Sequence, residues 1–446
     1  MAATIRRDGT SRLISDNRWG NFPSVSGAWK ISNEPFMSNS SFISDLKLRA
    51  SYGKLGNVQN LGNYATIAAL DNLPGSAAQQ IFSGFTFADA VNANVVWEET
   101  IKRGIGIDAT FFGGKLYTTM DFYLEDTENL IFNRPIALSA GKSGDPSDNG
   151  PTVRNSGFEL ELGYRKSAGD WSYGLNVNFS TNKNEVTDLA GEEEAFKTDG
   201  IVVGKPVRSF FGYVTNGIIQ SQNDVDSNPY LKAEENEVTK EPGDIWWVDI
   251  NGDGIVNADD RTIIGSVYPD FTYGFVGDVN YKNIGLQIQL QGVQGVDKDI
   301  STQNDFGLFH YFQRWALNHD DEILDRWHTT KNPAGNMPKV DITDKGRNRV
   351  LSDFWLHDAS YLRISNVNLY YNFPQGVLDK IKMGDLTVYF SIQNLYTFTD
   401  FIGNEVEFGE DTFKDIFPDT ALPENSDPLV GVPQPRTWTL GLKATF

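Results

Sequence analysis

The sequence predicts an all-β fold: part of an antiparallel, up-and-down transmembrane β-barrel with long extracellular loops. Apolar and polar residues alternate along many segments, and short connections alternate with very long ones. No stretch approaches 18 consecutive apolar residues, so the sequence contains no candidate for a membrane-spanning helix. A barrel strand needs only about 9–11 residues with every second position apolar, which is compatible with low mean hydropathy.

Composition excludes several classes of protein. The chain has 446 residues and no cysteine, so it has neither disulfides nor thiolate sites. The net charge of −21 repels nucleic acid backbones, and we expect no nucleic acid partner. Aromatic residues make up 13% and there are 42 glycines, a composition typical of extended structure with many turns.

Strict alternation predicts sheet strands with one apolar and one polar face. In 284–291, for example, isoleucine and leucine alternate with glycine and glutamine. The polar positions are rich in Gln, Asn, Thr and Gly, as in a water-filled lumen. Polar positions that would line the passage, or simply face solvent, are Glu159, Glu161, Gln287, Gln289 and Gln291.

In chain order, the pattern predicts about 12 strands that cross the membrane. They are expected near 1–7, 18–32, 44–56, 95–112, 115–126, 153–167, 171–183, 270–282, 284–294, 361–373, 384–395 and 435–446. The strand-like segment 206–220 is assigned to a loop, because counting it as a crossing would put a short turn on the wrong side. A soluble β-sandwich also alternates, but the predicted strands are longer than the usual 5–6 residues.

The connections differ systematically in length. Tight turns are expected at 113–114, 167–170 and 282–283. Long segments at 59–94, 127–150, 185–269, 295–360 and 396–434 lie between the predicted strands. Short turns on one side and long loops on the other are typical of outer-membrane barrels.

Several sequence stretches occur in an order that matches one family. They are RRDGTSR at 6–12, WGNFPSVSGAW at 19–29, LKLRASYG at 46–53 followed by Gly56-Asn57, Trp97-Glu98 with Gly106-Ile107-Asp108, NSGFE at 155–159, YLRI at 361–364 and the closing strand to Phe446. Together they resemble the SusC/RagA family of TonB-dependent outer-membrane transporters from Bacteroidota.

The resemblance implies that residues 1–446 are the C-terminal part of such a barrel. A full barrel of this class has about 22 strands, so roughly ten would be absent. The first residues carry no signal peptide. The signal peptide, the TonB box and the plug domain would all precede residue 1, and we therefore expect a piece of a longer protein.

The resemblance also implies a function for the intact parent: import of an oligosaccharide or a peptide across the Gram-negative outer membrane, without enzymatic chemistry. The implied partners are a SusD-like surface lipoprotein, outer-membrane lipid and the TonB complex, which would act through the missing plug. Two alternatives stay open: a TonB-dependent siderophore or vitamin receptor, and a soluble carbohydrate-binding β-sandwich.

The segment 249–260 fits the spacing of a calcium loop, with oxygen ligands at positions 1, 3, 5, 7 and 12. The ligands would be Asp249, Asn251, Asp253, the carbonyl of Ile255 and Asp260. Glycine at position 6 allows the sharp turn, and calcium prefers several oxygen ligands. The alternative is a turn without an ion, because Asp, Asn and Gly favour turns in any case.

Other candidate residues carry weaker signals. Loop aromatics could stack on sugars or contact a partner, or simply pack the loops; they are Trp246, Trp247, Phe306, Phe309, Tyr311, Phe312 and Trp315. The carboxylate runs at 192–194 and 320–322 are typical of solvated loops. The four histidines show no metal-ligand spacing, and no nucleophile elbow is present, so we predict that the chain is not an enzyme.

Overall fold

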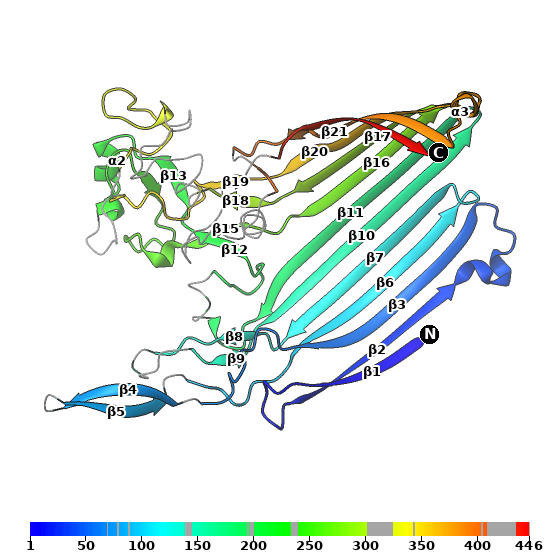
Figure 1. Ribbon diagram of the computed structural model, residues 1–446. Coiled ribbons are helices and arrows are strands. Elements are labelled where there is room, and N and C mark those ends of the chain that lie inside the picture. Colours follow the sequence, from blue (N-terminus) through cyan, green and yellow to red (C-terminus); the bar gives the residue numbers. More distant parts are fainter. Residues whose placement is uncertain are drawn as a thin grey trace. The chain divides into compact units, whose positions relative to one another are not determined.

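The computed structural model describes the whole chain except residues 69, 78–79, 88–89, 138, 140–144, 194–195, 197–199, 233–239, 301–323, 342–343, 403–404, 408–433 and 446. The chain divides into two compact units. Unit 1 contains residues 1–166 and 174–207, and unit 2 contains residues 167–173 and 208–446. The strands and the short helices of the two units are labelled in Figure 1.

Long neighbouring strands form one antiparallel ladder in unit 1. The strands are β1 (Ala2–Gly9), β2 (Trp19–Lys30), β3 (Ile43–Asn57), β6 (Glu98–Phe111), β7 (Leu116–Glu128), β10 (Thr152–Ala168) and β11 (Trp171–Asp188), with the turn between the last two grouped in unit 2. The register opposes Ile105 to Phe122 and Phe122 to Phe158. Each strand therefore pairs with the strand that follows it in the ladder, as an up-and-down sheet requires.

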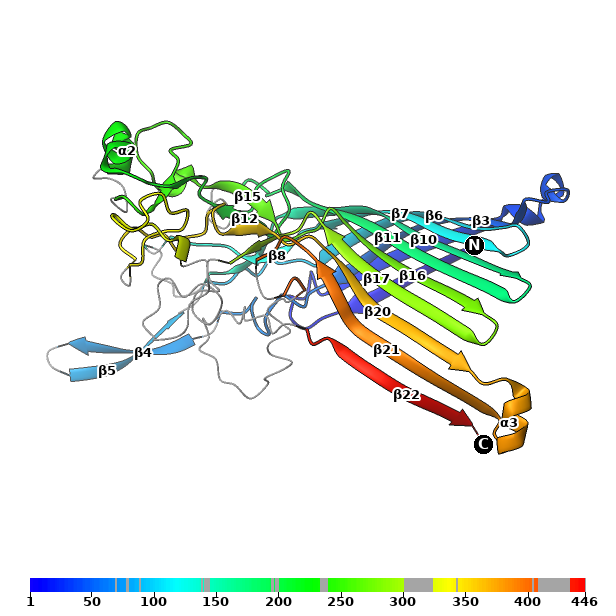
Figure 2. The same cartoon turned by 90° about the horizontal axis from the view of Figure 1, so that it is seen from above.

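Unit 2 continues the same pattern. Its long strands are β16 (Phe271–Tyr281), β17 (Ile284–Gln294), β20 (Tyr361–Asn372), β21 (Asp385–Phe398) and β22 (Thr437–Thr445). Figure 2 shows these strands from above, with the helix α3 (Gln375–Ile381) at the turn between β20 and β21. Among the described residues, twelve strands follow one another in the order of the sheet, which confirms the predicted antiparallel up-and-down fold class.

The two faces of the strands differ in chemistry, because side chains alternate across a strand. On β6 and β7, one face carries Ile105 and Phe122, which are 57% and 52% exposed although they are large and apolar. We call this side the apolar face. The opposite side, the polar face, carries Asp108 on β6 and Asp121 on β7. An exposed apolar face opposite a polar face is the pattern of a barrel wall that contacts lipid.

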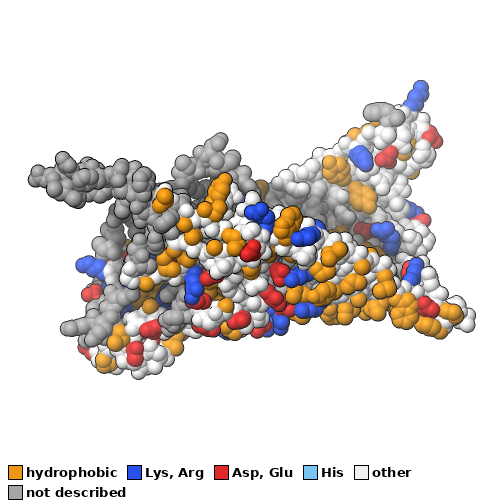
Figure 3. Space-filling model, turned by 90° about the horizontal axis from the view of Figure 1, so that it is seen from below, with side chains coloured by type: hydrophobic (Ala, Val, Ile, Leu, Met, Phe, Trp, Pro, Cys, Tyr) orange, Lys and Arg blue, Asp and Glu red, His pale blue; other side chains and the backbone are white. Residues whose placement is uncertain are grey.

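Hydrophobic side chains form a broad exposed area on the face drawn in Figure 3, bordered by acidic and basic groups. Soluble proteins rarely expose contiguous apolar patches of more than a few hundred Å². No helix among the described residues has the length and apolar character needed to cross a membrane.

The predicted long loops carry their own small elements. Two-stranded pairs form between β4 (Leu70–Ala77) and β5 (Gln80–Phe87), β8 (Ile131–Asn133) and β9 (Ser147–Asn149), β12 (Ser209–Gly212) and β15 (Thr262–Ser266), β13 (Thr215–Ile218) and β14 (Ile245–Trp247), and β18 (Asp297–Asp299) and β19 (Leu356–Asp358). Short helical turns are η1 (Ile31–Asn33), η2 (Pro35–Met37), α2 (Gln222–Ser227), η4 (Pro229–Lys232) and η5 (Ala258–Asp260). The segment 206–220 therefore lies outside the long ladder, as predicted.

The loops of unit 2 share one buried core. It contains Tyr213, Ile218, Ile245, Trp247, Val256, Ile300, Trp327, Trp355, Ala359, Tyr361, Phe401 and Val406. Tyr213 stacks on Trp247 with ring centroids 4.1 Å apart, and Trp355 is 1% exposed. Residues up to 193 positions apart in sequence therefore pack together, and the loops form a folded scaffold on unit 2.

Candidate functional site

The polar face of unit 2 is lined by side-chain amides. We call them the amide row: Gln287, Gln289 and Gln291 on β17, with Asn366 and Asn368 on β20. The register places Gln287 opposite Asn368 and Gln289 opposite Asn366. A bulge between Gln289 and Leu290 shifts the pairing by one residue, so that Gln291 lies opposite Arg363. Amides both donate and accept hydrogen bonds, so this surface can bind hydroxyl or peptide groups without carrying charge.

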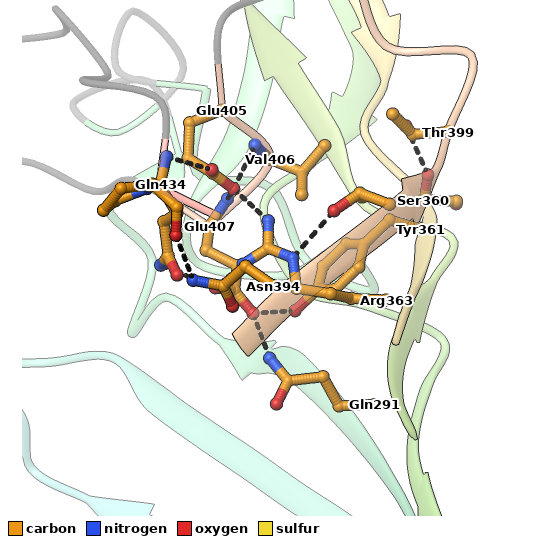
Figure 4. Close-up of polar contacts among 12 residues, drawn as sticks. Gln291, Ser360, Tyr361, Arg363, Asn394, Thr399, Glu405, Val406, Glu407 and Gln434 are labelled. Carbon is orange, nitrogen blue, oxygen red and sulfur yellow. Dashed lines mark hydrogen bonds and ion pairs between the residues drawn. The ribbon is translucent and has the colours of Figure 1, made fainter. Parts of the chain in front are cut away.

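A buried ionic cluster stands at the loop end of this row (Figure 4). Arg363 is only 2% exposed and donates from Nη1 to Glu407 Oε2 at 2.5 Å. Its Nη2 donates to Glu405 Oε1, and its Nε donates to Thr397 Oγ1 at 2.8 Å. Two carboxylates and a hydroxyl thus satisfy one guanidinium, which a buried charge requires.

Neutral groups complete the cluster. The Tyr361 hydroxyl donates to Glu407 Oε1 at 2.6 Å, and Gln291 of the amide row donates to the same oxygen. The backbone N–H of Gln434 donates to Glu405 Oε2 at 3.2 Å. The cluster therefore ties residues 405–407 and the approach to β22 onto the end of the amide row, and it positions a loop segment above that surface.

Unit 1 has an ionic network on its polar face. Arg49 on β3 binds Asp108 of β6 through two hydrogen bonds of 3.0 Å, and it also donates to Asp121 of β7 at 2.9 Å. Lys47 donates to Asp108 at 3.1 Å. An open hollow of about 400 Å³ lies here, lined in part by Lys47, Arg49, Ser51 and Asp121. Planar bidentate pairing fixes the guanidinium in place.

The predicted passage-lining residues lie where alternation places them. Glu159 and Glu161 of β10 alternate with Phe158 and Leu160, and they pair across β7 with Asp121 and Thr119. They therefore share the polar face with Asp121. Whether they contact a passing solute stays a prediction.

The loop aromatics divide into described and undescribed groups. Trp247 is buried in the core, and Trp246 donates from its ring nitrogen to the Tyr230 hydroxyl at 2.8 Å. These two rings therefore pack the loops. Phe306, Phe309, Tyr311, Phe312 and Trp315 lie outside the described residues.

The predicted calcium loop is a tight turn with inward hydrogen bonds. Asp249 accepts from the N–H groups of Gly252 and Gly254 at 2.7 and 2.9 Å. Asp260 is fully buried and accepts from the N–H of Ile250 at 2.9 Å, which brings the two ends of the loop together. Gly254 has φ +87°, the turn expected at position 6.

The loop 249–260 offers several oxygen donors to a metal ion. Among the described residues, no three acidic, histidine or cysteine side chains gather in an arrangement that holds a metal. Asn251 and Asp253 each accept from a backbone N–H two residues ahead, at 2.8 Å. A donor set of carboxylates, an amide and the Ile255 carbonyl is chemically suited to calcium, and calcium binding stays a prediction.

The Arg363 cluster was not predicted from the sequence. Arg363 lies within the YLRI stretch, but its partners are 42 and 44 residues further along the chain. The only available signal was a charged residue in a strand beside otherwise uncharged neighbours.

The sequence is similar to that of known receptors. A family model described as TonB dependent receptor-like, beta-barrel matches residues 2–395. TonB-dependent receptor P3 of Formosa agariphila is 30% identical over 99% of this chain and 43% of its own length. TonB-dependent receptor SusC of Bacteroides thetaiotaomicron is 26% identical over 91% of this chain and 39% of its own length.

Among solved structures, the RagAB peptide importer in its closed-closed state has a chain that superposes on all of this chain and on 45% of its own length. The TM-score is 0.73 and the sequence identity 25%. The chain thus spans less than half the length of the relatives that it matches.

Proposed function

The chain belongs to the TonB-dependent receptor β-barrel family and is located in the outer membrane, and from this premise we propose that it forms wall and recognition loops of a nutrient importer. The proposed cargo is a polar polymer, an oligosaccharide or a peptide. The reaction is transport without covalent change. The observation that carries the proposal is the amide row capped by the loop segment that Arg363 holds.

The amide row supports a polar, uncharged cargo. Amides suit the hydroxyl groups of a sugar and the peptide groups of an extended chain. A peptide importer is named among the similar structures, and SusC among the relatives. A surface lipoprotein of the SusD kind would rest on the loops, and the TonB complex would supply energy through a plug.

The test is accumulation of labelled solute in cells that produce the whole protein carrying this chain. The solutes are an oligosaccharide mixture, a peptide mixture and ferric chelates. Replacing Gln287 and Gln289 together by leucine should reduce polymer uptake several-fold at equal surface abundance. The matched control, Ile288→Leu on the apolar face, should leave uptake unchanged.

Two results would reject the proposal. Accumulation of ferric chelates alone would favour a siderophore receptor. A chain that stays dispersed in water without detergent would favour a soluble sandwich.

We also propose that calcium stiffens the loop 249–260. The ligands would be Asp249, Asn251, Asp253, the Ile255 carbonyl and Asp260.

The test compares protease cleavage within this loop with and without calcium, in the whole protein in detergent. Calcium should slow cleavage several-fold. Asp253→Asn should weaken that effect, whereas Asp259→Asn, a neighbouring change outside the ligand set, should preserve it. Equal cleavage with calcium and with a chelator would identify a turn without an ion.

A further inference from the structure

A side-chain arrangement that spans three neighbouring strands recurs on the polar face of the strands. In each copy, a tyrosine ring lies over a glycine of the next strand, and its hydroxyl donates to an asparagine of the strand beyond. We call this arrangement the Tyr–Gly–Asn motif. The described copies are Tyr117 with Gly163 and Asn176, Tyr123 with Gly157 and Asn182, and Tyr370 with Gly285 and Asn280.

The absence of a side chain on the middle strand makes the motif possible. A Cβ on any of the three glycines would lie within 2.5 Å of the tyrosine that covers it, which is too close for a side chain. Neighbouring strands are about 4.8 Å apart, so the hydroxyl must act across roughly 10 Å to meet the third strand. The Tyr117 hydroxyl does so and donates to Asn176 Oδ1 at 2.8 Å.

The copy in unit 2 shows how the three positions align. Gly285 of β17 lies opposite Tyr370 of β20 on one side and opposite Asn280 of β16 on the other. The three residues therefore stand in one line across the strands. A tyrosine over a glycine thus indicates where the asparagine lies on the following strand.

An incomplete fourth copy stands at the edge of the ladder. Tyr389 of β21 lies opposite Gly441 of β22, and a Cβ on this glycine would also lie within 2.5 Å of the tyrosine ring and hydroxyl. Among the described residues, β22 pairs only with β21, and the Tyr389 hydroxyl has no hydrogen-bond partner. The tyrosine and the glycine are present, and the strand that would carry the asparagine is not among the described residues.

The free edge of β22 calls for a neighbouring strand. Backbone N–H and C=O groups at membrane depth have no water to bind, so an edge there must be paired. On the apolar side of β22, the side chains of Trp438, Leu440 and Leu442 are more than half exposed. This chain spans less than half the length of similar receptors, which leaves ample sequence for further strands.

The first strand of this chain does not carry the missing group. The polar face of β1 carries Ala2, Thr4, Arg6 and Asp8, and Arg6 pairs with Asp8 at 2.7 Å. None of these side chains is an amide. A strand that completes the fourth motif must therefore come from another part of the sequence.

We propose that the strand bordering β22 runs antiparallel to it, belongs to the part of the longer protein outside residues 1–446, and presents an asparagine to the Tyr389 hydroxyl across Gly441. The contact would set the register of this strand. A slip of one residue would turn the asparagine to the apolar face, and a slip of two would move it by about 7 Å. The site is independent of the cargo.

The first test is photo-crosslinking in the whole protein in outer membranes. Tyr389 is replaced by p-azidophenylalanine, whose reactive group takes the place of the hydroxyl, and the crosslinked peptides are identified by mass spectrometry. The crosslink should join a strand outside residues 1–446, at an asparagine or its immediate neighbour. The same replacement of Tyr370 calibrates the method, because its crosslink should reach Asn280 of β16.

Several crosslinking results would overturn the proposal. One is a crosslink to β1, of the same chain or of a second copy. Another is a crosslinked strand with no asparagine opposite Gly441. A reaction confined to β21 and β22, while position 370 reaches β16, would show that no strand places a side chain there.

A second measurement tests the hydrogen bond itself. Tyr389→Phe removes only the hydroxyl and should raise the rate at which detergent opens the folded protein about five-fold, as Tyr370→Phe should. Replacing the crosslinked asparagine by alanine should have the same effect, and the two changes together should add nothing further. The matched control, Tyr371→Phe on the apolar face of β20, should not change the rate. Equal rates for Tyr389→Phe and Tyr371→Phe would also overturn the proposal.

Discussion

Two buried cations stabilise the loops of unit 2 by different means. Arg363 is surrounded by carboxylates, so its charge is compensated directly. Lys240 is 3% exposed; its Nζ lies 3.5 Å from the centroid of the Trp247 ring and donates to the Gly346 carbonyl at 2.5 Å. Removing one partner of a buried charge costs more than forming the pair gains. Each cation therefore makes the local fold depend on a single side chain.

Burial lowers the pKa of Lys240 to about 7, against the opposing effect of Asp244 and Asp344. The folded loops thus bind fewer protons than the unfolded chain between pH 7 and about 10.5, so their stability should rise with pH across that window. The full difference between the folded and unfolded pKa of Lys240 corresponds to a change in stability of at most about 5 kcal/mol. The rate of backbone hydrogen exchange at residues 240–248, corrected for the effect of pH on exchange itself, measures this change in stability.

The matched variants make the pH prediction specific. Lys240→Met should abolish the rise in protection with pH, because the titrating amine is gone. Lys345→Met, an exposed neighbour in the same loops, should behave as the parent does. Protection that falls between pH 7 and 10 in the parent would contradict the assignment.

At the scale of elements, the long strands could be predicted from the sequence and the loop structure could not. Period-2 alternation is a local signal, and predicted segments such as 284–294 and 361–373 match β17 and β20 within one residue. The hairpin β4–β5 was not predicted, because the sequence of its first strand, LDNLPGSA, carries a proline and little alternation. The ionic clusters of Arg363 and Arg49 join residues on separate strands or loops, and sequence spacing alone does not indicate their partners.

Close approach of neighbouring strands also depends on glycine. A Cβ on Gly106 of β6 would lie 2.3 Å from Asp121 Oδ1 and 2.6 Å from Arg49 Nη2. Gly106→Ala should therefore displace the side-chain ends of Asp121 and Arg49 and cost about 1 kcal/mol, the value of an ion-pair network on a wet surface. Gly104→Ala, two residues away, meets Ser51 Oγ at 3.1 Å and should cost less than about 1 kcal/mol. Urea unfolding of the two variants in lipid vesicles measures how much stability each one loses. Equal losses of stability would contradict the prediction.

For the whole molecule, one property recurs in both units: long strands such as β7 and β17 separate an apolar row from a polar row. In unit 1, Phe122 lies opposite Ile105 and Phe158, and in unit 2, Ile288 lies opposite Gly277 and Val367. The loop cores are conventional buried clusters, whereas the strand rows remain exposed. Membership of the TonB-dependent receptor family explains why the apolar rows are exposed. In an outer-membrane barrel, lipid hydrocarbon packs against these rows in place of protein.

Adjacent residues on the two faces should therefore respond oppositely to the same substitution. Ile288 and Gln289 are neighbours near the middle of β17, one on each face. Ile288→Arg should cost about 2–4 kcal/mol of folding free energy, because it places a charge against hydrocarbon. Gln289→Arg, on the wet side, should cost less than about 1 kcal/mol. The measurement is the free energy of folding into vesicles, by urea titration of the whole protein. A larger loss for Gln289→Arg would reverse the assignment of the two faces of β17, and with it the placement of the amide row.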